Sequence, residues 1–305
     1  MKKILVATDK PFAKVAADQI KAIFAKANYE CVFFEKYSQQ SDFVTAVEVY
    51  DALIIRSDKV DKDVISNAKK LKIVVRAGAG YDNVGLASAT EHGVCVMNTP
   101  GQNSNAVAEL VFGMMVYQIR NHFDGTSGTE LKDKKLGIHA YGNVGKNVAR
   151  IAKGFGMKVY AFDPFVSKSE IENDGVTVLN TVEKLYETCQ FVSLHIPATA
   201  QTKKSINHAL LSKMPENAVL INTARKEVIN EDDLKVIFNE RKDFHYVADV
   251  QPDCAGELFD FGKQYYFTPK KLGAQTEEAN INAGIAAANQ IIDFFEKNDI
   301  RFKVN

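Results

Sequence analysis

Two arginines near the N-terminus stand where apolar runs of the chain end. Arg56 follows the apolar residues 53–55, and Arg76 follows residues 73–75 and opens a glycine-containing loop. A single arginine after a strand is usually a solvated or salt-bridged surface group. Two arginines at the ends of successive strands, beside bare backbone N–H groups, instead indicate an anion site where guanidiniums bind a phosphate and the loop binds a carboxylate. The residues expected to bind a substrate that carries these two anionic groups are Arg56, Ser57, Arg76, Gly78, Ala79 and Gly80.

A strand–turn–helix–strand pattern in the second half of the chain contains a variant of the dinucleotide-binding fingerprint. Its turn is AYGNVG at residues 140–145, with Ala140 in place of the first glycine. Gly142 would let the backbone approach a pyrophosphate at the helix N-terminus, and Gly145 would let the helix pack closely against the strand. Asp163 would bind the ribose hydroxyls and repel a 2′-phosphate, which favours NAD over NADP. The alternative is an ordinary strand–helix connection whose glycines only relieve crowding.

Polar residues also follow the later strands of the second half. Arg225 comes shortly after an apolar strand, Asp249 ends the next strand, and Lys270 and Lys271 follow the last one. Because the carboxyl ends of parallel strands meet at one edge of a sheet, we expect these groups to line a ligand cleft there. A lone histidine at a strand end, as at His195, is more often structural than catalytic.

The elements that must position these residues alternate between strand and helix along the whole chain. This alternation indicates an α/β architecture with parallel sheets. Residues 98–101 interrupt the first series and a second series begins at Leu136, so two doubly wound domains are expected. Strands are expected at residues 3–7, 29–34, 52–55, 72–75, 94–97, 136–138, 158–162, 191–195, 218–222, 246–249 and 265–268, and the clearest helices at residues 11–27, 104–120 and 277–297.

The composition excludes several classes of partner. The 305 residues include 38 Lys plus Arg and 38 Asp plus Glu, so nothing indicates nucleic acid or an anionic membrane as a partner. No apolar run approaches the roughly 20 residues that span a bilayer, and the N-terminus runs directly into a strand pattern. The four cysteines lack CxxC spacing, which fits a reducing compartment, and no metal site is expected. A cytoplasmic location is therefore expected.

A series of segments gives the chain a resemblance to a known family. They are RAGAGYDNV, NTPGQNSNAVAEL, the AYGNVG turn, HIPATAQT, NTARKEVINEDDL, the segment around Asp249 and TPKKLGAQTEEAN. They span nearly the whole chain, which resembles the D-2-hydroxyacid dehydrogenase superfamily. The segments IIRSDKV and VVRAGAGYDNV make it most similar to the branch that acts on 3-phosphoglycerate, in the short form with lysine in place of the catalytic histidine.

The resemblance implies two Rossmann-like domains, NAD as cofactor and a homodimer whose contact includes the helix after Pro100. It implies a discontinuous, flavodoxin-like substrate-binding domain at residues 1–98 and 281–305 and an NAD-binding domain at residues 99–280. It also implies hydride transfer with a small phosphorylated 2-hydroxy acid. The reaction would be oxidation of 3-phospho-D-glycerate to 3-phosphohydroxypyruvate, the first step of L-serine biosynthesis.

The family's functional residues carry over onto matching positions of this chain. Arg225 matches the catalytic arginine that binds the substrate carboxylate and carbonyl oxygen, and Arg56 and Arg76 match the phosphate-binding arginines. The loop at residues 78–80 matches the carboxylate cradle. The expected cofactor-binding residues are Ala79, Gly142, Asn143, Val144, Gly145, Asp163, Pro164, His195, Ile196, Pro197, Thr202, Thr223, Ala224, Arg225, Asp249, Gly273 and Ala274.

Two positions depart from the family pattern. The family's glutamate, 29 residues after the arginine, is Cys254 here. Lysine replaces the family's histidine, and one extra residue lies between the flanking anchors. Counting back from Gly273 assigns the position to Lys271, whereas counting forward from Thr268 assigns it to Lys270. The glycine lies nearer the expected cofactor, so Lys271 is the preferred catalytic residue and Lys270 is the alternative.

We interpret these two replacements as one coupled change. The amine of a free lysine has a pKa of about 10.4. A neighbouring carboxylate would raise that pKa, the wrong direction for a base, whereas loss of the carboxylate, burial and a nearby Arg225 would lower it. Lys271 would then remove the proton from the substrate hydroxyl as hydride passes to the nicotinamide.

Two other functions compete with this interpretation. A hydroxypyruvate or glyoxylate reductase on the same fold would not need two phosphate-binding arginines. A non-catalytic, NADH-sensing binding protein would account for the missing glutamate and histidine, but the presence of Arg225 argues against it.

Overall fold

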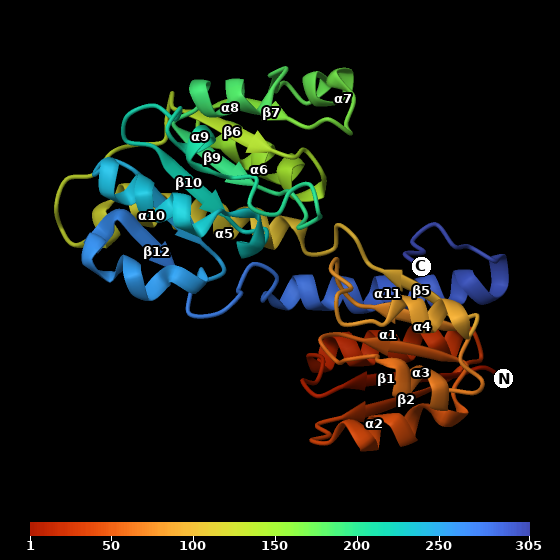
Figure 1. The fold of residues 1–305 in the computed structure, drawn as a ribbon. Coiled ribbons are helices and arrows are strands. Elements are labelled where there is room, and N and C mark those ends of the chain that lie inside the picture. The colour runs from red at the N-terminus through yellow and green to blue at the C-terminus, as the bar shows by residue number, and fades with distance from the viewer. The chain divides into compact units, whose positions relative to one another are not determined.

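Alternating strands and helices build two parallel sheets in the computed structural model, which describes all of residues 1–305 (Figure 1). The chain divides into unit 1, Met1–Asn103 with Gln275–Asn305, and unit 2, Ser104–Ala274. These boundaries lie a few residues from those expected at 98 and 281. The predicted α/β class with two doubly wound parallel sheets is confirmed.

Unit 1 contains a five-stranded sheet in the order β2-β1-β3-β4-β5, with every neighbouring pair parallel. The chain adds β2 on one side of β1 and β3 on the other, so the carboxyl ends of β1 and β3 form the switch point where such sheets bind ligands. The strands are β1 Lys3–Thr8, β2 Glu30–Glu35, β3 Ala52–Ile55, β4 Ile73–Arg76 and β5 Cys95–Asn98. The helices are α1 Lys14–Lys26, α2 Gln40–Ala46, α3 Lys62–Asn67, α4 Leu86–Glu91 and α11 Glu277–Lys297, with a 3₁₀ turn η1 at Val47–Val49. Helix α11 packs against α1 and so returns the C-terminal end of the chain to this unit (Figure 1).

Unit 2 contains a seven-stranded parallel sheet in the order β12-β11-β10-β9-β6-β7-β8. Its switch point lies between β6 and β9. The strands are β6 Lys135–His139, β7 Lys158–Phe162, β8 Thr177–Val178, β9 Phe191–Leu194, β10 Val219–Asn222, β11 His245–Ala248 and β12 Tyr265–Phe267. The helices are α5 Ser104–Ile119, α6 Asn143–Gly154, α7 Lys168–Asn173, α8 Val182–Thr188, α9 His208–Leu211 and α10 Glu231–Glu240, with 3₁₀ segments η2 Asn121–Phe123, η3 Lys226–Val228 and η4 Asp253–Gln264.

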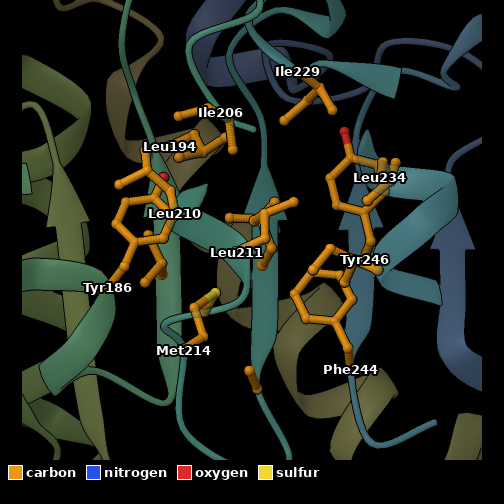
Figure 2. Packing of buried hydrophobic residues seen from close by; sticks show 14 of the residues in the cluster. Tyr186, Leu194, Ile206, Leu210, Leu211, Met214, Ile229, Leu234, Phe244 and Tyr246 are labelled. Carbon is orange, nitrogen blue, oxygen red and sulfur yellow. The ribbon is translucent and has the colours of Figure 1, made fainter. Parts of the chain in front are cut away.

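Each face of the unit 2 sheet has its own apolar core. Helices α5 and α6 pack together over one face, and α8, α9 and α10 cover the other. Figure 2 shows the core under α8, α9 and α10, in which Tyr186, Leu211 and Phe244 are fully buried. Burial of one such side chain contributes about 1.5–3 kcal/mol, so both faces hold the strands, and with them the loops at their ends, in fixed positions.

The long apolar helix expected after Pro100 is α5. Most of its apolar side chains, including Val111, Phe112 and Met115, are buried within unit 2. Packing inside the unit therefore accounts for its apolar character, and the homodimer remains a prediction. No helix of the chain combines the length and the hydropathy that crossing a membrane requires.

Two elements differ from the sequence-based expectation. The helix expected from Pro11 begins at Lys14, because Ala13 before it has an extended conformation (φ −55°, ψ 144°). Strand β8 was not expected, because two residues at a sheet edge carry no periodic pattern.

Candidate functional site

The site residues expected in unit 2 all follow the carboxyl ends of its strands. Strands β7, β6, β9, β10, β11 and β12 are neighbours in a parallel sheet, so the loops after them share one edge. The residues are Gly142, Asn143, Val144 and Gly145 after β6; Asp163 and Pro164 after β7; His195, Ile196, Pro197 and Thr202 after β9; Thr223, Ala224 and Arg225 after β10; Asp249 after β11; and Lys271, Gly273 and Ala274 after β12. The structure thus brings these residues to one edge, while Ala79 follows β4 in unit 1.

The turn between β6 and α6 is shaped by close backbone packing. Ala140 has φ +80°, a region that favours glycine, although glycine is absent there. A Cβ added to Gly145 would lie 2.5 Å from the Ala140 carbonyl oxygen and 3.0 Å from Ile138 Cγ2, so only glycine fits. At Gly142, before the first turn of α6, an added Cβ would meet nothing within 4 Å. The backbone there is open to a ligand, and the helix N-terminus behind it suits a diphosphate.

Gly145→Ala should lower the free energy of unfolding by about 1–3 kcal/mol, because the methyl group must displace the Ala140 carbonyl. It should also weaken nucleotide binding by moving the turn. Gly154→Ala in the same helix is the matched control, since a Cβ there meets no atom within 4 Å. That control should leave the stability unchanged or raise it by up to about 1 kcal/mol. Thermal unfolding of both variants checks this, and equal stability of the two would contradict the packing argument.

The Asp163 carboxylate is fixed at the end of β7. Its Oδ2 accepts a hydrogen bond from Tyr141 N at 2.7 Å, and its Oδ1 accepts one from Phe165 N at 2.8 Å. Tyr141 is itself fully buried, and its hydroxyl donates to Asp174 Oδ2 at 3.0 Å. Asp163 is only half-buried, so its remaining lone pairs can accept hydrogen bonds from ribose hydroxyls.

Two imidazoles lie at the switch point of the unit 2 sheet. His139 Nδ1 lies 3.3 Å from the Tyr186 hydroxyl, and His195 Nε2 lies 3.0 Å from Ser193 Oγ. Burial, and then the neighbouring His139, lower the pKa of His195 to about 3, and burial lowers the pKa of His139 to about 4. Both rings are therefore neutral near pH 7, and neither holds a proton to donate as an imidazolium.

Two cationic side chains converge on one backbone carbonyl after β10. The Ala224 oxygen accepts hydrogen bonds from an Arg225 guanidinium nitrogen at 2.9 Å and from Lys271 Nζ at 3.3 Å. Lys271 is exposed, so the expectation that its amine is buried is wrong: the loop after β12 carries it at the surface. Asn222 shapes this turn, because its Oδ1 accepts from Ala224 N at 3.0 Å and its Nδ2 donates to the Arg225 oxygen at 3.0 Å. The adjacent Thr223 Oγ1 is buried and has no hydrogen-bond partner, so a polar group of a bound ligand would satisfy it.

Cys254 is buried at the start of η4, beside a carboxylate from α10. The Cys254 N–H donates to Glu231 Oε2 at 2.7 Å, and the Asp253 N–H donates to Glu231 Oε1 at 3.0 Å. Burial, and then the charge of Glu231, raise the pKa of the Cys254 thiol to about 12. The thiol is therefore neutral near pH 7 and supplies no carboxylate-like charge.

The two arginines of the proposed anion site are neighbours in unit 1. Arg76 Nε donates to the Arg56 oxygen at 3.0 Å, and its guanidinium occupies the space that a Cβ on Gly78 would need. The Arg56 guanidinium lies over the Phe12 ring and donates to Asn280 Oδ1 of α11 at 2.5 Å. Burial lowers the pKa of Arg56, and the charges of Asp58 and Asp9 oppose that shift.

The loop after β4 only partly matches the expectation of three bare amides. The Gly78 N–H donates to the Arg76 oxygen at 2.8 Å and is therefore already used. The expectation that this amide faces an anion is corrected accordingly. Ala79 and Gly80 are half-buried, and Ser57 is exposed.

Sequence reasoning missed the residues that hold the site residues in place. They are Tyr141, Asn222, Asn280 and Thr268, whose hydrogen bonds join segments that lie apart in the sequence. The one local signal is Asn222, which directly precedes the turn and can cap it with its own amide. The others depend on tertiary structure.

Comparisons with known proteins agree with this geometry. Residues 111–260 match the family model described as the NAD binding domain of D-isomer specific 2-hydroxyacid dehydrogenase. The solved structure of Entamoeba histolytica 3-phosphoglycerate dehydrogenase bound to NAD⁺ is 45% identical, covers 100% of this chain and 98% of its own, and superimposes with a TM-score of 0.90.

Two curated relatives carry different names. D-3-phosphoglycerate dehydrogenase of Methanocaldococcus jannaschii is 34% identical over 83% of this chain and 51% of its own length. Hydroxypyruvate reductase of Thermotoga maritima is also 34% identical, over 84% of this chain and 88% of its own length. The chain thus spans about half the length of the first relative, as it does of D-3-phosphoglycerate dehydrogenase from Synechocystis.

Proposed function

This chain belongs to the D-isomer specific 2-hydroxyacid dehydrogenase family, and we propose that it oxidises 3-phospho-D-glycerate to 3-phosphohydroxypyruvate with NAD, the first step of L-serine biosynthesis. The observation that carries this proposal is the convergence of Arg225 and Lys271 on the Ala224 oxygen. That arrangement places an anion-binding guanidinium beside an amine able to exchange a proton.

NAD fits the residues at the carboxyl edge of unit 2. Gly142 leaves the backbone open at the N-terminus of α6, and Asp163 offers a half-buried carboxylate whose position is fixed by two amides. Thr223 Oγ1 is a buried hydroxyl without a partner. A negative charge at Asp163 repels a 2′-phosphate, which favours NAD over NADP.

Lys271 and Arg225 have different roles in the proposed reaction. When bound, the nicotinamide supplies the acceptor for the hydride that leaves the substrate's C2. Lys271, as the neutral amine, takes the proton from the C2 hydroxyl, so the alcohol loses two electrons and two hydrogens in total. Arg225 binds the carboxylate and stabilises the negative charge that develops on the oxygen. In the reverse direction the Lys271 ammonium returns the proton.

The absence of a carboxylate at position 254 agrees with the use of an amine as base. The family pattern that the sequence resembles has a carboxylate at this position, whereas the Cys254 thiol is neutral near pH 7. The Arg225 guanidinium shares the Ala224 oxygen with Lys271 and is its cationic neighbour there.

We assign recognition of the substrate phosphate to Arg56 and Arg76. Phosphate binding by two guanidiniums predicts discrimination between phosphorylated and unphosphorylated keto acids. The value of kcat/KM for 3-phosphohydroxypyruvate should exceed that for hydroxypyruvate by about 10²-fold or more, because each charge-assisted hydrogen bond contributes about 1.5–3 kcal/mol. Oxidation of NADH with each keto acid measures this ratio, and equal values would contradict the assignment.

Arg76→Gln should remove most of that discrimination by lowering kcat/KM for the phosphorylated acid alone. Arg301→Gln is the matched control, because Arg301 lies in the same unit and its exposed side chain pairs with Asp299. If Arg76→Gln lowered the efficiency on both keto acids equally, the arginine would have no specific role toward the phosphate.

A hydroxypyruvate reductase is the second candidate, because the Thermotoga maritima relative of that name matches over most of its own length. The comparison of the two keto acids separates the candidates. Retained NADH binding without turnover of any 2-hydroxy acid would instead favour an NADH-sensing protein. The homodimer and the cytoplasmic location remain predictions from the sequence.

A further inference from the structure

We propose that Asp249 is the positioning residue that places Lys271, rather than Lys270, at the reacting hydroxyl; this inference rests on the proposed function. The two lysines are adjacent in the loop after β12, and residue counting in the sequence leaves both possible. The hydrogen bonds around Asp249 distinguish them.

Asp249 binds both ends of the lysine loop. It is fully buried after β11. Its Oδ1 accepts from Leu272 N at 2.6 Å and from Thr268 Oγ1 at 3.1 Å, and its Oδ2 accepts from Gly273 N at 2.8 Å. A buried carboxylate is costly unless charge-assisted hydrogen bonds satisfy it. These three bonds satisfy it and hold residues 269–271 as a closed loop.

The absence of a side chain at Gly273 allows this arrangement. A Cβ there would lie 2.8 Å from Asp249 Oδ2 and 3.3 Å from Val107 Cγ2. The backbone N–H can therefore approach the carboxylate only because the residue is glycine. The C-terminal end of the loop is thus fixed directly against β11.

The two lysines occupy different places in the closed loop. Lys271 directly precedes the Leu272 amide that Asp249 holds, and its Nζ reaches the Ala224 oxygen at 3.3 Å. Lys270 lies one residue farther from that amide. Only its carbonyl is held, by Thr268 Oγ1 at 2.9 Å. Both lysines are exposed, and the contact of Lys271 Nζ with the Ala224 oxygen is what separates them. Asp249 therefore fixes the backbone next to Lys271, from which the Lys271 amine reaches the oxygen that Arg225 also contacts.

Asp249→Asn should lower kcat by about 10- to 100-fold, because the amide group must face a backbone N–H and one charge-assisted hydrogen bond is lost. The dissociation constant of NADH is measured by fluorescence titration in the same variant, because Asp249 is also among the expected cofactor-binding residues, so that an effect on the nucleotide is separated from the effect on kcat. Asp260→Asn is the control, since Asp260 is an exposed carboxylate of the same unit. Thr268→Val loosens the other end of the loop and should lower kcat less.

Combination with Lys271→Ala separates positioning from other roles. If Asp249 acts through Lys271, Asp249→Asn or Thr268→Val should not lower the residual single-turnover rate of Lys271→Ala any further. A further fall in the double variants would overturn the proposal, and so would a loss of NADH affinity with kcat preserved in Asp249→Asn. Full activity of Lys271→Ala alone would instead contradict the proposal that Lys271 exchanges the substrate proton. The inference about Asp249 rests on that proposal and would fail with it. Thr268→Val gives the same test if Asp249→Asn does not fold.

Discussion

Lys271→Ala should lower turnover by about 10²- to 10⁴-fold while the affinity for NADH stays nearly unchanged. The reason is that the proposed proton transfer needs the Lys271 amine, which lies at the Ala224 oxygen beside Arg225 and is not among the residues expected to bind the cofactor. Steady-state rates with 3-phosphohydroxypyruvate and fluorescence titration with NADH measure the two quantities.

Lys270→Ala is the control for this prediction. Lys270 has the same charge and is the adjacent residue, and both lysines are exposed, but only Lys271 Nζ contacts the Ala224 oxygen. Lys270→Ala should keep nearly full turnover. The opposite ranking, with Lys270→Ala inactive and Lys271→Ala active, would transfer the proton-transfer role to the other lysine.

Arg225→Lys should lower kcat/KM by about 10²- to 10³-fold even though the charge is kept. A guanidinium offers a planar fork that binds a carboxylate with two hydrogen bonds, and a lysine ammonium does not reproduce it. The shorter arrangement of donors on the new amine would also not reproduce the contact that the guanidinium makes with the Ala224 oxygen. Arg150→Lys on α6 is the control, because Arg150 donates only to neighbouring amide side chains at the surface.

Activity within threefold of wild type in Arg225→Lys would show that charge alone is sufficient. Such a result would remove the argument that Arg225 orients the carboxylate. NADH affinity is measured alongside, because Arg225 is also among the expected cofactor-binding residues, and it should stay near the wild-type value in Arg150→Lys.

The strands were predictable because a covered parallel sheet demands short apolar runs. Residues 52–55 and 158–162 were expected with the same bounds that the structure has, since both runs are bordered by polar or turn residues. Strand β8 escaped prediction because two residues gain their conformation only from pairing with β7. The start of α1 was misplaced because proline is common in a first helical turn, whereas here the chain stays extended as far as Ala13.

The loops that carry the expected site residues could be predicted from the sequence, but the hydrogen bonds between those residues could not. Glycines in a strand–helix turn and polar residues after apolar runs indicate a ligand edge, because parallel topology brings strand ends together. The sequence left Lys270 and Lys271 as alternatives, because the proposed choice depends on hydrogen bonds that the loop amides donate to Asp249, more than 20 residues earlier. The pairing of Arg56 with Asn280 likewise joins the two ends of the chain and has no local signal.

The role of Lys271 as the base is tested most directly by the pH dependence of kcat/KM for oxidation of 3-phosphoglycerate, measured in wild type and in Lys271→Ala. Because a base must be deprotonated to act, the wild-type profile should rise with pH along a limb that reports the Lys271 amine. The residual activity of Lys271→Ala should lack that limb. The same limb in both proteins would assign the titration to another group and contradict the proposed proton transfer.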